Sequence, residues 1–130
     1  AAVGAPFRSS VCFLAGGETT VTVRGRGTGG RCQEFALAGA LQIEGLTGAT
    51  LAAFSTDGAD GPPGRNPPVA GAVADGRTAA RARARNIDPR RMLDRNDAYS
   101  FFQKVGGLIR TGPTRTHLND LYLLMIERPE

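Results

Sequence analysis

Glycine clusters divide this chain into short segments, and this division constrains its fold more than any other feature of the sequence. Eighteen of the 130 residues are glycine, spread along the chain without the three-residue period of collagen. Such clusters favour tight turns and backbone that lies close to a ligand, because glycine has no Cβ. With 41% hydrophobic residues, the chain can bury one core. The sequence therefore predicts a single folded domain over residues 1–130.

Segments typical of strands alternate with segments typical of helices. Residues 11–15 and 19–23 flank a Gly-Gly turn, which predicts an N-terminal β-hairpin. Apolar runs predict further strands at residues 50–55, 108–110 and 121–126. Helices are predicted at residues 31–46 and after the capping positions Asp75, Asp88 and Asn96. This alternation predicts an α/β fold, a layered α/β/α domain with a mixed β-sheet and the N-terminal hairpin.

Composition argues against several classes of protein. The formal net charge is +4, but nearly all the basic residues are arginine in an Ala- and Gly-rich background, so we expect no nucleic-acid partner. The longest apolar run, residues 121–126, is far shorter than the roughly 18 residues of a membrane span. Cys12 and Cys32 lack the spacing of a metal site, and we expect two free thiols in a reducing, cytoplasmic compartment.

A glycine-rich segment, residues 25–30, leads into the first predicted helix at Arg31. Backbone N–H groups of such a segment can approach an anion, and an arginine at the helix start adds donors suited to phosphate or carboxylate. The pattern is neither a Walker A box nor a convincing dinucleotide fingerprint. The alternative is a set of purely structural turns, which is the commoner role of such glycines.

An acidic turn follows the predicted strand at residues 50–55. Asp57 there could hold Mg²⁺ or accept a hydroxyl proton, whereas Asp60 is expected to bond to its own turn. We expect three loops, residues 25–31, 56–61 and 111–120, to converge on one edge of the sheet, where open α/β sheets bind ligands. Glu18, after the Gly-Gly turn, could meet Arg31 either as a substrate-orienting pair or as an ordinary ion pair.

A competing hypothesis uses Cys32 and His117. A thiol at a helix N-terminus would have a lowered pKa, and a nearby imidazole could activate it as a nucleophile. The alternative is that the cysteine is a small buried residue and the histidine lies on the surface.

Five separated motifs resemble the MOFRL domain, the C-terminal domain of class II glycerate kinases, which are also named hydroxypyruvate reductases. The resemblance runs from about residue 14 to residue 126. Its motifs are residues 16–23, 29–31 with 33–34, 56–58 with 60–62, 96–97 with 101–102, and 111–114 with 119–121. Five motifs in the same order make the resemblance specific, although each alone is weak.

The resemblance implies ATP- and Mg²⁺-dependent phosphoryl transfer to D-glycerate, giving 2-phosphoglycerate. It also implies that a Rossmann-like N-terminal domain, absent from these residues, completes the cleft, so that the isolated domain would be inactive. The residues that match the motifs are then Arg31 and Asp57 as catalytic groups, with Asp57 also on the metal. Glu18 and Asn119 would bind substrate. Gly29 and Gly30 would bind the nucleotide cofactor.

The chain departs from the family pattern in three places. Cys32 stands where the family usually has Asn, and residues 115–117 stand where it usually has Gly-Thr-Asn. The link at residues 64–68 looks like an insertion. These departures leave two alternatives open: a non-catalytic ligand-binding or interaction domain, and a hydroxypyruvate reductase. A homodimer is also possible.

Overall fold

The structure is a computed structural model that describes residues 9–64 and 68–128, so part of the 64–68 link lies outside the described residues. Five strands and four helices are assigned in this part of the chain. The strands are β1 (Val11–Gly17), β2 (Ala49–Ser55), β3 (Gly71–Asp75), β4 (Leu108–Ile109) and β5 (Asp120–Ile126). The helices are α1 (Arg31–Gln42), α2 (Thr78–Ala84), α3 (Pro89–Asp94) and α4 (Ala98–Val105).

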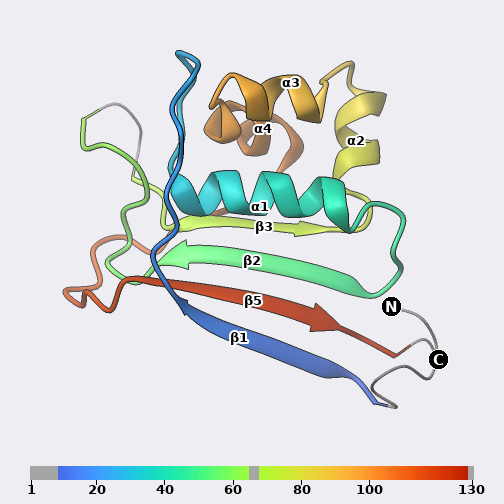
Figure 1. The fold of residues 1–130 in the computed structure, drawn as a ribbon, viewed down its shortest axis with the longest axis horizontal. Helices are drawn as coiled ribbons and strands as arrows, with labels where there is room; N and C mark the ends of the chain where they lie inside the picture. Colours follow the sequence, from blue (N-terminus) through green and yellow to red (C-terminus); the bar gives the residue numbers. More distant parts are fainter. Residues whose placement is uncertain (1–8, 65–67, 129–130) are drawn as a thin grey trace.

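The strands form one sheet in the order β1-β5-β2-β3-β4 (Figure 1). Every neighbouring pair is antiparallel, so the α/β class is confirmed while the expected mixed pairing is replaced by a purely antiparallel sheet. The reason lies in strand direction: β5 runs opposite to both β1 and β2, and it separates them. As predicted from its apolar run, β5 is an interior strand.

The described helices lie on one face of the sheet, whereas α/β/α layering requires helices on both faces (Figure 1). Helix α1 packs directly on β2 and β3, and α2, α3 and α4 cover α1. The largest core cluster sits between these layers and contains Leu37, Phe101 and Phe102 together with alanines from α1 and β3. Small residues let α1 lie close to the sheet; at Gly39 a Cβ would fall within 2.0 Å of Leu51 Cδ2.

The predicted N-terminal hairpin is wrong. Strand β1 pairs with β5, more than a hundred residues later, and residues 18–24 form no strand. Side chains hold this segment instead: Asn96 Oδ1 accepts from the N–H groups of Arg24 and Gly25, and Asn96 Nδ2 donates to Thr22 O. The alternating Thr and Val pattern at residues 19–23 therefore does not mark a strand here.

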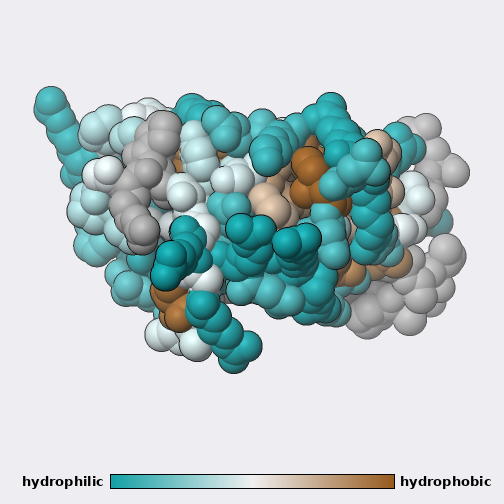
Figure 2. Space-filling view, turned by 90° about the horizontal axis from the view of Figure 1, so that it is seen from above, coloured by the Kyte–Doolittle hydropathy of each residue, from teal (hydrophilic) through white to brown (hydrophobic). Residues whose placement is uncertain are grey.

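The helix-covered side of the molecule is mostly hydrophilic (Figure 2). Arginines of α2 and its flanks, among them Arg77, Arg81 and Arg85, are exposed there, as expected for a solvated face. No helix in the described ranges is both long and apolar enough to pass through a bilayer.

Candidate functional site

One end of the sheet brings the predicted loops together. The register places Gly17, Asp120 and Ser55 side by side, as the last residue of β1, the first of β5 and the last of β2. Residues that follow or precede these three positions must therefore emerge at the same edge. The loops also touch directly, because Thr56 N donates to Asn119 O and a Cβ on Gly61 would fall within 2.5 Å of Gly29 O. The expected convergence is confirmed, and strand register is its cause.

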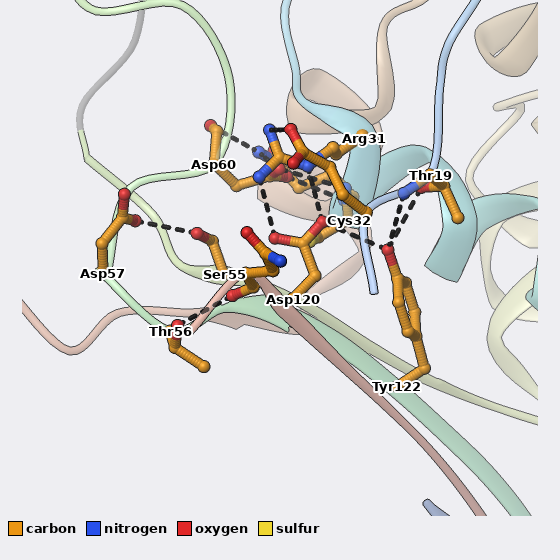
Figure 3. A network of polar contacts seen from close by, with 12 residues as sticks. Thr19, Arg31, Cys32, Ser55, Thr56, Asp57, Asp60, Asp120 and Tyr122 are labelled. Carbon is orange, nitrogen blue, oxygen red and sulfur yellow. Dashed lines mark hydrogen bonds and ion pairs between the residues drawn. The ribbon is translucent and has the colours of Figure 1, made fainter. Parts of the chain in front are cut away.

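Arg31 lies at this edge, at the first residue of α1, and Asp120 binds it from below (Figure 3). The guanidinium donates through Nε to Asp120 Oδ2 at 2.5 Å and through Nη2 to Oδ1 at 2.9 Å. This bidentate contact with a fully buried carboxylate raises the pKa of Arg31 further, so the group stays charged.

The contact with Asp120 uses one side of the guanidinium, and the described residues make no hydrogen bond to its Nη1 end. Of the five N–H donors of an arginine, two point at Asp120, and those on Nη1 do not. Glu18 Oε1 lies 3.8 Å from Nη1, which is an ion pair across a gap longer than a hydrogen bond. The expected meeting of Glu18 and Arg31 is confirmed.

The roles of Asp120 and Tyr122 were not predicted from the sequence. Tyr122 Oη donates to Asp120 Oδ2 at 3.1 Å and accepts from Thr19 N at 3.2 Å. A usable indication was present, because a lone carboxylate at the start of a buried apolar run needs a charged partner. What the sequence could not give was the identity of that partner, which lies 89 residues away along the chain.

Asp57 lies beyond the end of β2 and forms the Asx-type turn that we had expected of Asp60. Its Oδ1 accepts from Ala59 N and Ser55 Oγ, both at 2.8 Å. These bonds lower the pKa of Asp57, with smaller contributions from His117 and Arg31. Oδ2 points away from the turn and lies 3.6 Å from His117 Nδ1. Asp57 is thus an ionised, half-exposed carboxylate within electrostatic range of Arg31.

Asp60 is a buried structural residue, but its partners lie outside its own turn. It accepts from the N–H groups of Cys32 and Gln33, at 3.0 and 2.9 Å, and from Gln33 Nε2. The expected local bond is therefore wrong: Asp60 caps the first turn of α1 from a distant loop. Two of the helix amides that could have bound an anion are occupied by this carboxylate.

The glycines at the start of α1 are required by packing. A Cβ on Gly30 would fall 2.5 Å from Asp60 Cγ and Gly61 N, and one on Gly29 would fall 3.2 Å from Tyr99 N. The same glycines line a cleft of about 340 Å³ together with Arg31, Glu34 and residues of the N-terminal segment. Their N–H groups precede those that Asp60 caps and remain outside that cap.

Asn119 acts through its backbone in this structure. It adopts a left-handed conformation with φ of 61°, and its carbonyl accepts from Thr56 N and Thr56 Oγ1. This joins the loop before β5 to the turn after β2. The residue is exposed at the same edge as Asp57, so its side chain is open to a ligand.

The structure does not support the Cys32 and His117 hypothesis. Cys32 is fully buried, and burial raises the pKa of its thiol instead of lowering it. His117 lies beside Asp57 on the exposed loop. Within the described part of the chain, no group of three or more His, Cys, Asp or Glu residues could hold a metal ion alone.

This chain is similar to known proteins in both sequence and fold. The model of the MOFRL family matches residues 11–120. A D-glycerate 2-kinase of Thermotoga maritima is 43% identical over 121 residues, and a glycerate 2-kinase of Pyrococcus horikoshii is 41% identical over 124. These alignments cover 93% and 95% of this chain, but only 28% and 27% of the relatives. The crystal structure of a glycerate kinase from T. maritima superposes with a TM-score of 0.87 at 43% identity, over 94% of this chain and 28% of that one.

Proposed function

The chain belongs to the MOFRL family, and from this membership we propose that it acts as the C-terminal part of a glycerate 2-kinase. The reaction would transfer a phosphoryl group from ATP to D-glycerate and give 2-phosphoglycerate. One observation supports this most strongly: a guanidinium fixed on one side and open at its end lies at the same sheet edge as an ionised carboxylate. Anion binding and phosphoryl transfer both need such a preorganised cation.

Arg31 would bind the anionic group with the free end of its guanidinium. A carboxylate or phosphoryl group can accept two parallel hydrogen bonds from that end. The charge is already in place and needs no reorganisation, which is what makes such groups effective in transition-state stabilisation. We assign it to the glycerate carboxylate or to the transferring phosphoryl group.

Glu18 and Asn119 would position the acceptor. A carboxylate close to Arg31 repels another anion, so Glu18 would accept a hydrogen bond from a glycerate hydroxyl instead of contacting its carboxylate. The exposed Asn119 side chain offers both a donor and an acceptor to the same ligand.

Asp57 is better suited to be a Mg²⁺ ligand than a general base. Its lowered pKa makes it a poor general base, whereas an ionised carboxylate oxygen is a good ligand for a hard cation. Mg²⁺ is commonly held by one or two carboxylates together with substrate phosphates, so a single Asp57 oxygen is sufficient from this chain. Mg²⁺ supplies neutralisation of the charge on the phosphates during transfer.

Gly29 and Gly30 would contribute backbone N–H groups to the phosphates of ATP. They line the cleft, and the positive end of the α1 dipole points there. The hydrogen bonds that the next two amides donate to Asp60 hold this corner in place, and the carboxylate also reduces its positive potential.

A second domain would close the site. The chain spans less than a third of the length of the curated relatives it matches, so the remaining part of such a protein would supply the other wall. Both cysteines are free thiols, which is consistent with the proposed cytoplasmic location.

The test is a coupled assay of ADP release on the longest natural chain that contains these residues. D-glycerate with ATP and Mg²⁺ should give equal amounts of ADP and 2-phosphoglycerate. A variant with Glu44→Gln, which alters an ion pair with Arg83 beyond the far end of α1, should behave as the parent protein does. Oxidation of NAD(P)H by hydroxypyruvate without use of ATP would instead establish the reductase, and the absence of both reactions would favour the non-catalytic alternative.

A further inference from the structure

Asp120 places a carboxylate inside the protein at the first residue of β5. It is fully buried, and the rest of the strand is apolar apart from the hydroxyl of Tyr122. A buried carboxylate persists only where hydrogen bonds and an opposite charge offset its lost hydration. Here Oδ2 accepts from Arg31 Nε and from Tyr122 Oη, and Oδ1 accepts from Arg31 Nη2.

We infer that Asp120 is a positioning residue that aims Arg31, with Tyr122 as its support. Arginine has a long, flexible side chain, and a contact through Nε and Nη2 fixes both the direction and the plane of the guanidinium. The end that carries Nη1 then lies on the side of Glu18, whose Oε1 is 3.8 Å away. This inference rests on the proposed function only in taking an anionic ligand as the partner of that end.

Asp120 does not itself face the ligand. Both of its oxygens are occupied, and none of its surface is exposed. It therefore acts through Arg31. Asp57 and Glu18, by contrast, are both accessible at the same edge.

Tyr122 connects Asp120, which orients Arg31, to the N-terminal segment. Its ring packs against Phe35 with centroids 4.6 Å apart, while its hydroxyl joins Asp120 to Thr19. Thr19 is the neighbour of Glu18, so one hydroxyl links the carboxylate that holds Arg31 to the segment that carries Glu18. Tyr122→Phe removes this link and keeps the ring.

Kinetics of the longest natural chain separate aiming from mere folding. Asp120→Asn should lower kcat/KM by about 100-fold, because small displacements of a catalytic charge are costly. Tyr122→Phe should lower it by about 5-fold, the effect of one hydrogen bond. Glu44→Gln is the control that also removes one negative charge. If Asp120→Asn matches that control, the inference is overturned.

Chemical rescue provides a readout that a purely structural role would not move. Added guanidinium at low millimolar concentration should partly restore the activity of the Arg31→Ala variant, because Asp120 still offers a site for the added cation. The double variant Arg31→Ala with Asp120→Asn should not respond. Equal rescue of both variants would overturn the inference even if Asp120→Asn also lowers the Tm.

A measurement independent of activity tests the contact between Asp120 and Arg31 separately from the proposed function. The Nε–H proton of Arg31, followed by ¹⁵N NMR and assigned with Arg31→Lys, should exchange slowly with water in the parent protein and fast in Asp120→Asn. If the parent protein shows slow exchange but no glycerate kinase activity, the proposed function fails while the hold of Asp120 on Arg31 stands. Fast exchange in the parent protein would overturn the inference.

Discussion

At the scale of single residues, the two aspartates of the acidic turn differ in their burial and in their hydrogen-bond partners. Asp57 and Asp60 are three residues apart and chemically identical, yet one is half-exposed and the other is buried under α1. Their local sequence, rich in glycine, gives both an equal chance to bond to the turn. The partners that decide between them, Cys32 N and Gln33 N, come from another element. The sequence therefore predicted that the acidic loop reaches this edge, but it could not reveal which hydrogen-bond partners Asp60 finds.

Arg31→Ala should lower kcat/KM for D-glycerate by about 100-fold or more, the usual effect of removing a preorganised charge donor. Steady-state kinetics of the longest natural chain measure it. Arg81→Ala, which removes an exposed arginine paired with Asp75, is the matched control and should change little. Near-normal kinetics of Arg31→Ala would exclude Arg31 from the site.

Asp57→Asn should make stability less dependent on pH. The pKa of Asp57 is lower in the folded protein than its ordinary value, so its charge stabilises the fold above that ordinary value. This contribution disappears as pH falls through the lowered pKa. Asparagine keeps the acceptor for Ala59 N and Ser55 Oγ, so the comparison isolates the charge.

Thermal unfolding at several pH values checks this sign. The parent protein should have the higher Tm near neutral pH, and the two melting temperatures should converge in strong acid. A difference that grows as pH falls would contradict the proposed cause.

At the scale of elements, the sequence predicted the strands and helices that have strong local patterns. β2 and β5 are compact apolar runs, and α1 begins at Arg31 as expected from the glycines before it. β3, with the sequence Gly-Ala-Val-Ala-Asp, has little β-propensity and forms because β2 pairs with it. The partner of β1 could not be predicted either, because pairing over such a separation leaves no local pattern.

Asp60→Ala should destabilise the fold by about 2 kcal/mol or more, since it uncaps α1 and leaves buried donors without a partner. Urea unfolding measures this change. Asp88→Ala is the matched control. Asp88 caps the short, exposed helix α3, and its loss should lower the free energy of unfolding by only about 1 kcal/mol. Equal losses would show that burial adds nothing to the cap at α1.

At the scale of the whole molecule, the loops meet at one edge of an antiparallel sheet. The expectation had been a crevice at the carboxyl ends of parallel strands. The three loops meet because β1 and β2 end where β5 begins, and the helices leave that edge uncovered (Figure 1). The expected convergence of the loops at one edge is observed, although the sheet topology behind that expectation is different. This chain covers only 28% and 27% of two glycerate 2-kinases, and we propose that further chain closes this edge.

Gly30→Ala should disrupt this edge. Its Cβ would meet backbone and carboxylate atoms of the 60–61 turn, which cannot move without uncapping α1. We expect a loss of several kcal/mol, or no folded protein at all, by urea unfolding. Gly16→Ala is the control, because the nearest atom to its Cβ would be Asp120 O at 3.8 Å. Similar stabilities of the two variants would contradict the close packing of the loops.

The role proposed for Arg31 is tested most directly by a crystal structure of the longest natural chain with D-glycerate and a non-hydrolysable ATP analogue. We expect the glycerate carboxylate or the terminal phosphoryl group on the Nη1 end of Arg31, with Asp120 still bound to Nε and Nη2. Binding of both ligands without contact to Arg31 would contradict this role.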